Sequence, residues 1–256
     1  MLIKSNEDLL ILLDHLLREP QNFWNDFYDD TCKNIPFFVN KPDENLVNYF
    51  EKEMIFPGRV LELGCGAGRN AIYLAKKGCS VVGVDISDKA LEWAKKRTDE
   101  ENIDVELVCA NIFESDFEEN SFDFIYDSGC FHHIAPHRRV NYTAMIDKLL
   151  KPEGYFALCS FEENGAYGGS TMTDEEVYLK RSLEGGLGYT KSQLQEIFHF
   201  LEEIEIRKML PMSTVDPHFG LEGFIVGLFQ KKLGERQMEN FEVVLSEYNS
   251  NWKEQF

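Results

Sequence analysis

The stretch Val60-Leu61-Glu62-Leu63-Gly64-Cys65-Gly66-Ala67-Gly68-Arg69-Asn70 decides the fold of this chain of 256 residues. A short apolar run ends in an acidic residue, three glycines alternate with small residues, and a helical pattern follows over 70–77. Glycine has no Cβ, so this backbone can turn sharply and let a ligand approach closely. The helix after it would offer free N–H groups at its N-terminus. The stretch therefore predicts a nucleotide-type loop at the end of a parallel strand.

The spacing of the glycines indicates which ligand this loop binds. Dinucleotide-binding loops read G-x-G-x-x-G, whereas positions 64, 66 and 68 give G-x-G-x-G and Arg69 stands where the third glycine would be. Glu62 would repel a pyrophosphate and suits a cationic amino group. Asp85 closes the next apolar run, 21 positions after Gly64, where an acid accepts hydrogen bonds from ribose hydroxyls. The pattern predicts an adenosine that carries an ammonium group and no diphosphate, which describes S-adenosylmethionine.

Alternating strand and helix patterns predict the rest of the fold. Strands at 59–63, 81–84, 105–109, 122–127 and 155–159 alternate with helices at 70–77, 88–98 and 136–150, which requires a parallel sheet with right-handed crossovers. The last two strands, 205–209 and 224–231, follow a helix at 191–198 and are joined by a loop alone, so they should pair antiparallel. We expect an α/β, Rossmann-like, seven-stranded, mostly parallel sheet with an antiparallel last strand and helices on both faces.

We expect one domain over 1–256, built from five segments. Leucines at helical spacing predict a first helix over 2–18 that Pro20 ends. The glycine-rich insertion leaves the carboxyl end of a strand and should hang over the ligand crevice. The segments are an N-terminal helical cap (1–55), a cofactor-binding core (56–160), a lid insertion (161–189), a helix with the strand pair (190–232) and a helical tail (233–256).

Composition narrows the partners and the compartment. The 26 basic and 45 acidic residues give a net charge of −19, which repels nucleic-acid phosphates and anionic membranes. The six cysteines show no C-x-x-C or metal spacing, so we read them as reduced and the protein as cytoplasmic. The N-terminus does not resemble a signal peptide, and no apolar run is long enough to span a membrane. The protein is expected to be a monomer or a homodimer.

Two motifs carry a resemblance to a known family. Glu62-Leu-Gly-Cys-Gly-Ala-Gly68, followed by Val84-Asp85-Ile86-Ser87, resembles the class I S-adenosylmethionine-dependent methyltransferases over about residues 23–232. The strings Gly-Arg-Asn-Ala-Ile-Tyr-Leu-Ala (68–75) and Phe-Trp-Asn-Asp-Phe-Tyr (23–28) are similar to the branch containing tellurite-resistance and thiopurine methyltransferases. The resemblance implies in-line transfer of a methyl group to a small-molecule acceptor.

The resemblance assigns cofactor contacts residue by residue. Glu62 would contact the methionyl ammonium or an ordered water, and Ile86 would lie against the adenine. Asn111 stands where the family usually has an acid, and its side-chain oxygen can accept the same bond from the adenine amino group. The expected cofactor residues are Trp24, Tyr28, Glu62, Gly64, Cys65, Gly66, Gly68, Arg69, Asp85, Ile86, Asn111, Ile112, Asp127 and Ser128.

Three of these residues keep a second interpretation. An aromatic ring from Trp24 or Tyr28 could cover the sulfonium, since aromatic faces attract cations, or it could belong to the apolar side of a covering helix. Arg69 could pair with the methionyl carboxylate or form a structural salt bridge.

The acceptor side should begin where the fourth strand ends. His132 or His133 could be a general base, or one imidazole could cap the next helix while the other packs. His137 and Arg138 belong to a dense basic spot that could bind an anionic substrate or offset nearby acids. A metal is not expected, because no carboxylate-rich shell accompanies the histidines. The catalytic candidates are His132, His133, His137 and Arg138.

Two rival functions remain at this point. A nicotinamide-dependent oxidoreductase would also use a Rossmann-like sheet, although the glycine spacing and Glu62 argue against it. A non-catalytic member of the fold that binds only S-adenosylmethionine or a protein partner is the other. The intact glycine loop and Asp85 argue against degeneration.

Overall fold

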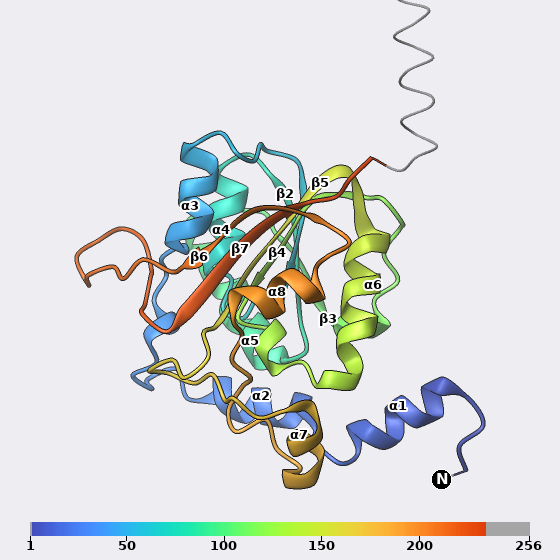
Figure 1. Cartoon of the computed structure of the whole chain (residues 1–256). Helices are drawn as coiled ribbons and strands as arrows, with labels where there is room; N and C mark the ends of the chain where they lie inside the picture. The colour runs from blue at the N-terminus through green and yellow to red at the C-terminus, as the bar shows by residue number, and fades with distance from the viewer. Residues whose placement is uncertain (1, 234–256) are drawn as a thin grey trace, which may run out of the picture.

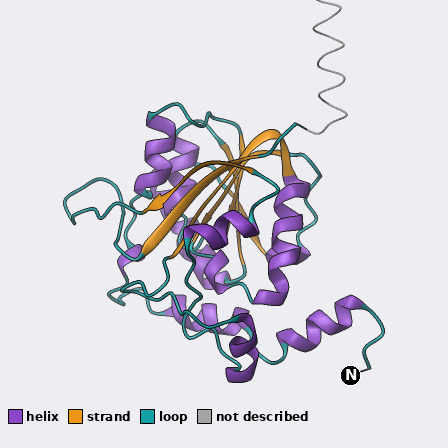
Figure 2. Ribbon diagram, in the orientation of Figure 1, coloured by secondary structure: helices purple, strands orange, loops and turns teal. Residues whose placement is uncertain are grey.

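A seven-stranded sheet forms the centre of the computed structural model, which describes residues 2–233 (Figures 1 and 2). The strand order is β3-β2-β1-β4-β5-β7-β6, and β7 is antiparallel to both of its neighbours while the first five strands are parallel. This confirms the predicted fold class. The strands are β1 (Arg59–Leu63), β2 (Ser80–Asp85), β3 (Glu106–Cys109), β4 (Phe122–Ser128), β5 (Leu150–Phe161), β6 (Glu202–Lys208) and β7 (Phe224–Gln230).

Helices cover both faces of the sheet because successive strand residues point to opposite sides. Leu61 and Leu63 of β1 belong to the core cluster that includes α6 and α8, whereas Val60 belongs to the cluster that includes α3 and α4. Figure 1 shows these two pairs of helices on opposite sides of the sheet. The α-helices are α1 (Asn6–Asp14), α2 (Pro20–Asp29), α3 (Glu44–Glu51), α4 (Arg69–Lys76), α5 (Asp88–Glu101), α6 (Arg139–Leu149), α7 (Asp174–Lys180) and α8 (Lys191–Ile197).

Some element boundaries differ from the sequence expectation. The first helix ends at Asp14, and Pro20 is the first residue of α2 because its fixed φ suits a helix start capped by Glu19. Pro136 begins the 3₁₀ turn η4 (Pro136–Arg138) rather than α6 itself. Ser87 caps α5 as predicted, by accepting a hydrogen bond from the N–H of Ala90. The expected helix over 233–256 lies outside the described residues, apart from residue 233.

The strand order places a ligand crevice between β1 and β4. The chain moves from β1 outward to β2 and β3 and then returns to β4 on the other side of β1, and ligands bind at the carboxyl ends of strands at such a switch point. In Figure 1, α1, α2 and α7 gather at one end of the sheet, below the other helices. The glycine loop after β1 and the segments near α2 and α7 meet around one cavity there.

Candidate active site

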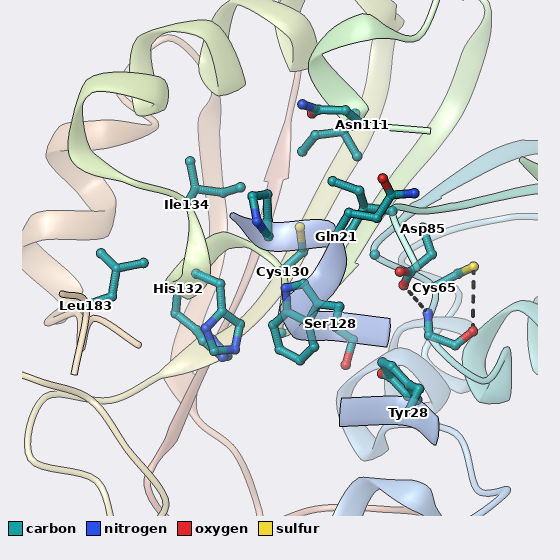
Figure 3. A pocket seen from close by; sticks show the side chains of 18 of the residues that line it. Gln21, Tyr28, Cys65, Asp85, Asn111, Ser128, Cys130, His132, Ile134 and Leu183 are labelled. Atoms are coloured by element: carbon teal, nitrogen blue, oxygen red, sulfur yellow. Dashed lines mark hydrogen bonds between the residues drawn. The ribbon is translucent and has the colours of Figure 1, made fainter. Parts of the chain in front are cut away.

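A cavity of about 970 Å³ lies at the carboxyl ends of the parallel strands. Its walls come from the glycine loop after β1, the ends of β2, β3 and β4, the chain from Asp14 to Tyr28, and residues 181–185 of the insertion. Figure 3 shows Asp85 and Cys65 toward one side of it and Ile134, His132 and Leu183 toward the other. The N-terminal segment and the insertion, predicted as cap and lid, therefore both contribute to the cavity wall.

The glycine loop is tightly enclosed. Gly64 and Gly66 have φ angles of +64° and +52°, the left-handed region that side chains disfavour. A Cβ on Gly64 would lie 2.8 Å from the Cβ of Cys130, and one on Gly66 would lie 2.6 Å from the Tyr28 hydroxyl oxygen. Tyr28 thus stands directly over the loop. Only glycine leaves room for both the turn and the covering aromatic ring.

Asp85 is held in place by the backbone. Its Oδ2 accepts a hydrogen bond from the N–H of Gly66 at 2.8 Å, and its Oδ1 accepts one from the N–H of Ser87 at 2.8 Å. Burial raises the pKa of Asp85 to about 6, against the opposing effect of these bonds. The carboxylate is therefore mainly ionised at neutral pH. Each oxygen keeps a lone pair for a further donor, such as a ribose hydroxyl.

Glu62 lies at the end of β1, buried to 1% exposure. Burial raises its pKa to about 8, although the nearby positive charge of Arg69 acts in the opposite direction. Among the described residues, its Oε2 is buried without a hydrogen-bond partner. An unpartnered buried oxygen on a cavity-lining carboxyl is a site for a cationic donor.

The guanidinium of Arg69 is bound by other side chains of the protein. Its Nη1 lies 2.7 Å from Asp43 Oδ1, its Nη2 donates to Ser128 Oγ at 2.9 Å, and its guanidinium lies 4.5 Å from the centre of the Phe219 ring. The structural salt bridge, one of the two readings of Arg69, is the arrangement observed. Arg69 is still one of the residues that line the cavity.

The remaining cofactor candidates fall into two groups. Trp24, Tyr28, Ile86, Asn111, Ile112, Ser128 and Cys65 line the cavity, with Asn111 also accepting from the N–H of Phe113. Asp127 and Gly68 are not part of the cavity wall. Asp127 is fully buried, where its Oδ1 accepts from the N–H of Cys130 at 2.8 Å and its Oδ2 from the hydroxyl of Tyr142 at 2.6 Å.

The two adjacent histidines lie at the other end of the cavity and are both weak bases. Nδ1 of His132 accepts a hydrogen bond from the N–H of Phe161, and the ring stacks on that of Phe161 with centroids 3.8 Å apart. Burial lowers the pKa of His132 well below its usual value. Burial, together with the charge of Arg18, lowers the pKa of His133 to about 3. Both imidazoles are neutral at physiological pH.

His137 and Arg138 bind acidic side chains of helix α1. Nε2 of His137 lies 2.7 Å from Asp14 Oδ1, and its Nδ1 lies 2.7 Å from the Tyr178 hydroxyl. Arg138 is ion-paired with Asp14 and Glu7. Of the two readings of this basic spot, the structure shows the one in which it offsets acids. His137 is absent from the cavity wall, whereas Arg138 is part of it.

Asp43 does not line the cavity but binds the wall residues Arg69 and Ser128. It stands at the N-cap position of α3, yet its side chain makes no cap bond and turns inward. Its Oδ2 accepts hydrogen bonds from the side chains of Asn70, Tyr126 and Ser128. An acid after a proline suggests an ordinary helix start, so local sequence carried no signal of this role. Wall residues that the sequence did not indicate include Arg18, Gln21, Phe113, Cys130, Arg181 and Leu183.

S-adenosylmethionine fits the residues present. The unpartnered Oε2 of Glu62 matches a methionyl ammonium, and the two oxygens of Asp85 match ribose hydroxyls. Gly64 and Gly66 of the loop between them line the same cavity. A diphosphate in the same place would meet two carboxyl groups.

Within 2–233, no group of three or more His, Cys, Asp or Glu side chains is arranged to hold a metal ion. No helix in that part of the chain has the length and apolar character needed to cross a bilayer.

Comparison with known sequences identifies relatives of this chain. A family model described as "Methyltransferase domain" matches residues 60–154. The cyclopropane-fatty-acyl-phospholipid synthase of Escherichia coli (strain K12) is 39% identical over 129 residues, which are 50% of this chain and 31% of the relative. The uncharacterized methyltransferase C750.03c of Schizosaccharomyces pombe is 35% identical over 104 residues, or 41% of this chain and 72% of the relative. The chain thus spans less than a third of the E. coli relative.

Solved structures share the fold at low sequence identity. One concerned with conversion of a disulfide bond into a thioacetal group during echinomycin biosynthesis has a TM-score of 0.68 at 20% identity, covering 89% of this chain and 98% of that one. The 1,6-didemethyltoxoflavin-N1-methyltransferase of Burkholderia thailandensis, solved with S-adenosylhomocysteine, has a TM-score of 0.59 at 22% identity, covering 91% and 92%. TehB from Haemophilus influenzae has a TM-score of 0.56 at 20% identity, covering 73% and 62%.

These comparisons agree with the site geometry. The matched segment, 60–154, contains the glycine loop, Asp85 and the strand ends that form the cavity floor. Placement within the tellurite-resistance or thiopurine branch stays a prediction, because structures at this level of identity share only the fold. On the sequence relatives and the motifs together, the chain belongs to the class I S-adenosylmethionine-dependent methyltransferases.

Proposed function

We propose that this protein transfers the methyl group of S-adenosylmethionine, in line, to a small-molecule acceptor. One observation carries the proposal: a single cavity joins the glycine loop, Asp85 and the unpartnered oxygen of Glu62 to a second region bordered by Trp24 and His133. Its volume of about 970 Å³ lies at the upper end of ordinary ligand pockets, roughly 300–1,000 Å³. That supports room for a cofactor and a second molecule.

The protein's part in this reaction is to align the reactants and exclude water. A bound sulfonium supplies an electrophilic methyl group, so holding the nucleophile in line with it provides most of the acceleration. We propose that segments 1–55 and 161–189 act as the two lids. Trp24 from the first and Leu183 from the second both line the cavity, which supports this division of the chain.

The histidines favour an acceptor that is already nucleophilic at neutral pH. The pKa of His133 is lowered to about 3. Such an imidazole is too weak a base to remove a proton from a hydroxyl group. A thiol or another chalcogen reacts as its anion without such a base. Nδ1 of His133 is buried and without a partner among the described residues. We propose that it positions the acceptor through a hydrogen bond.

Net charge and the state of the cysteines support a cytoplasmic location and a substrate other than nucleic acid. A net charge of −19 disfavours nucleic acid as a substrate, and all six cysteines are unpaired thiols in the described structure. We propose a cytoplasmic enzyme that acts on metabolites, as a monomer or a homodimer. The E. coli and B. thailandensis relatives are named for acceptors of very different kinds, so their names do not select one.

Calorimetry with S-adenosylhomocysteine tests the cofactor site directly. The wild-type protein should bind it, and Asp85→Ala should weaken binding by at least tenfold, because hydrogen bonds to a charged group contribute roughly 1.5–3 kcal/mol. Asp85→Asn keeps the shape of the side chain but puts an amide donor where one oxygen accepts, so it removes the charge and one of the two loop bonds. Asp104→Ala, at an exposed position before β3, is the matched control and should bind as the wild type does. Absence of binding by the wild type would end the proposal.

Release of S-adenosylhomocysteine across an acceptor panel tests catalysis. Thiols, metalloid oxyanions, amines and hydroxylated metabolites should be compared at neutral pH, with turnover expected in the first two groups. Tight cofactor binding with no turnover of any acceptor would instead favour a non-catalytic member of the fold. A change in NADH fluorescence on mixing would revive the nicotinamide alternative.

A further inference from the structure

Two arginines of the cavity wall have no carboxylate partner among residues 2–233. Arg18 lies between α1 and α2, and Arg181 follows α7; both line the cavity. The other two wall arginines, Arg69 and Arg138, are ion-paired with aspartates of the fold. Of the eight arginines in the described residues, Arg69, Arg138, Arg139 and Arg207 have carboxylate partners, and of the other four only Arg18 and Arg181 line the cavity. Two unneutralised guanidinium groups on one cavity therefore point to an external anion.

Arg18 is held so that its donors stay free. Its guanidinium carbon lies 3.4 Å from the centre of the Phe23 ring, a stack that fixes the plane of the group and leaves its N–H edges open. Phe23 packs edge-on against Trp24 at 5.1 Å, and Trp24 packs edge-on against His133 at 4.8 Å. This chain of contacts places Arg18 at the acceptor end of the cavity.

The acids nearest to Arg18 in the sequence are already occupied. Asp14 binds His137 and Arg138. The carboxylate of Glu19 caps α2, where it accepts hydrogen bonds from the N–H groups of Gln21 at 2.9 Å and Asn22 at 2.7 Å. Neither side chain is left to neutralise the guanidinium.

The same end of the cavity also has apolar walls. Trp24, Ile134 and Leu183 line it, and Figure 3 shows Ile134 and Leu183 on the side away from Asp85. An acceptor that fills this end must bury apolar surface, since hydrophobic walls favour apolar ligand atoms. An anionic group at one end of such a molecule would reach the arginines.

We propose that the methyl acceptor is an amphipathic small molecule whose carboxylate or phosphate binds Arg18 and Arg181, while its apolar body lies against Trp24, Ile134 and Leu183. The inference rests on the proposed function, because it names the substrate class of the same site. The sequence suggested that the basic spot at 137–139 binds an anionic substrate, but its arginines are paired with aspartates of the protein. The proposal assigns anion binding instead to Arg18 and Arg181, one from each of the segments 1–55 and 161–189.

Matched aryl probes test this charge recognition. Protein saturated with S-adenosylhomocysteine is titrated by calorimetry with 4-mercaptobenzoate, with its methyl ester and with phenyl phosphate. The free acid should bind about tenfold more tightly than the ester, because it adds charge-assisted hydrogen bonds, and the preference should shrink at high salt. The relative affinities of 4-mercaptobenzoate and phenyl phosphate decide between carboxylate and phosphate.

Variants assign the preference to the two arginines. Arg18→Gln and Arg181→Gln should each reduce the preference for the acid severalfold, and Arg18→Lys should restore part of it. Lys52→Gln removes one charge from an exposed site outside the cavity and should leave the preference intact. Unchanged binding of S-adenosylhomocysteine in every variant shows that the fold is retained.

The outcomes of this inference and of the proposed function are separable. Equal affinity for acid and ester, or binding of no probe by protein that still binds S-adenosylhomocysteine, would overturn the anionic acceptor alone. Failure of the wild type to bind S-adenosylhomocysteine would instead overturn the proposed function.

Discussion

Glu62 combines full burial with an oxygen that has no partner among the described residues. With its pKa raised to about 8 by burial, the side chain is mainly a neutral acid at pH 7. A ligand ammonium beside it favours the ionised form and lowers the pKa again. Ligand binding should therefore release a proton from this single side chain.

The pH dependence of S-adenosylhomocysteine affinity tests this coupling. Below pH 8 the free protein holds the proton and the complex does not, so affinity should rise with pH by up to about one log unit per pH unit and level off above pH 8. Glu62→Gln cannot ionise and should flatten the rise between pH 6.5 and 8. The amino group of the ligand titrates alike in both proteins, so the difference isolates Glu62. An unchanged slope in Glu62→Gln would refute the coupling.

At the scale of elements, α1 depends on polar anchors more than on packing. The helix has nine residues and no fully buried side chain. Isolated helices of this length are marginal in water, so tertiary contacts must hold it. Its contacts with η4 include the bonds from Asp14 to His137 and Arg138. These bonds also fix the chain that leads to Leu17 and Arg18 in the cavity wall.

Asp14→Asn should loosen this element without unfolding the domain. Removal of the charge weakens the bonds to Arg138 and His137, so amide hydrogen exchange in α1 should become at least severalfold faster. The unfolding transition of the whole domain should change little, because the core clusters do not include α1. Glu7→Gln, at the more exposed and longer contact with Arg138, is the control and should have the smaller effect. Equal protection of α1 in wild type and Asp14→Asn would show that packing alone holds it.

At the scale of the whole molecule, Asp43 joins parts of the fold that are distant in sequence. It is fully buried and binds side chains from α4 and β4, next to the cavity wall. Arg69, its ionic partner, has a side chain only 10% exposed. The pair therefore links the glycine-loop helix, the fourth strand and the entry to α3.

Asp43→Ala should lower the free energy of unfolding by about 3–5 kcal/mol, because it leaves the buried charge of Arg69 unpaired. Denaturant unfolding measures the change. Asp174→Ala breaks an Arg–Asp pair in which the aspartate is 60% exposed, and it should cost at most about 1 kcal/mol. Comparable losses for the two variants would mean that Asp43 does not hold the fold together in this way.

Features that depend on neighbours along the chain could be predicted from the amino-acid sequence. The glycine spacing, the period-two strands, the Ser87 cap and the offset of Asp85 follow from local backbone geometry, and they were sufficient to predict the sheet, its antiparallel end and the cofactor class. The predicted end of the first helix was wrong: the helix ends at Asp14 and Pro20 begins the next one, because capping choices compete over a few residues.

The pairing of charged side chains within residues 2–233 depends on how distant segments pack together. Arg69 pairs with Asp43 and Arg138 with Asp14, 124 positions away, and no local pattern encodes such partners. The weak basicity of His132 and His133 likewise comes from burial by segments far apart in the chain. Pairing and burial are properties of the packed molecule, so they become visible only when distant segments enclose the same space.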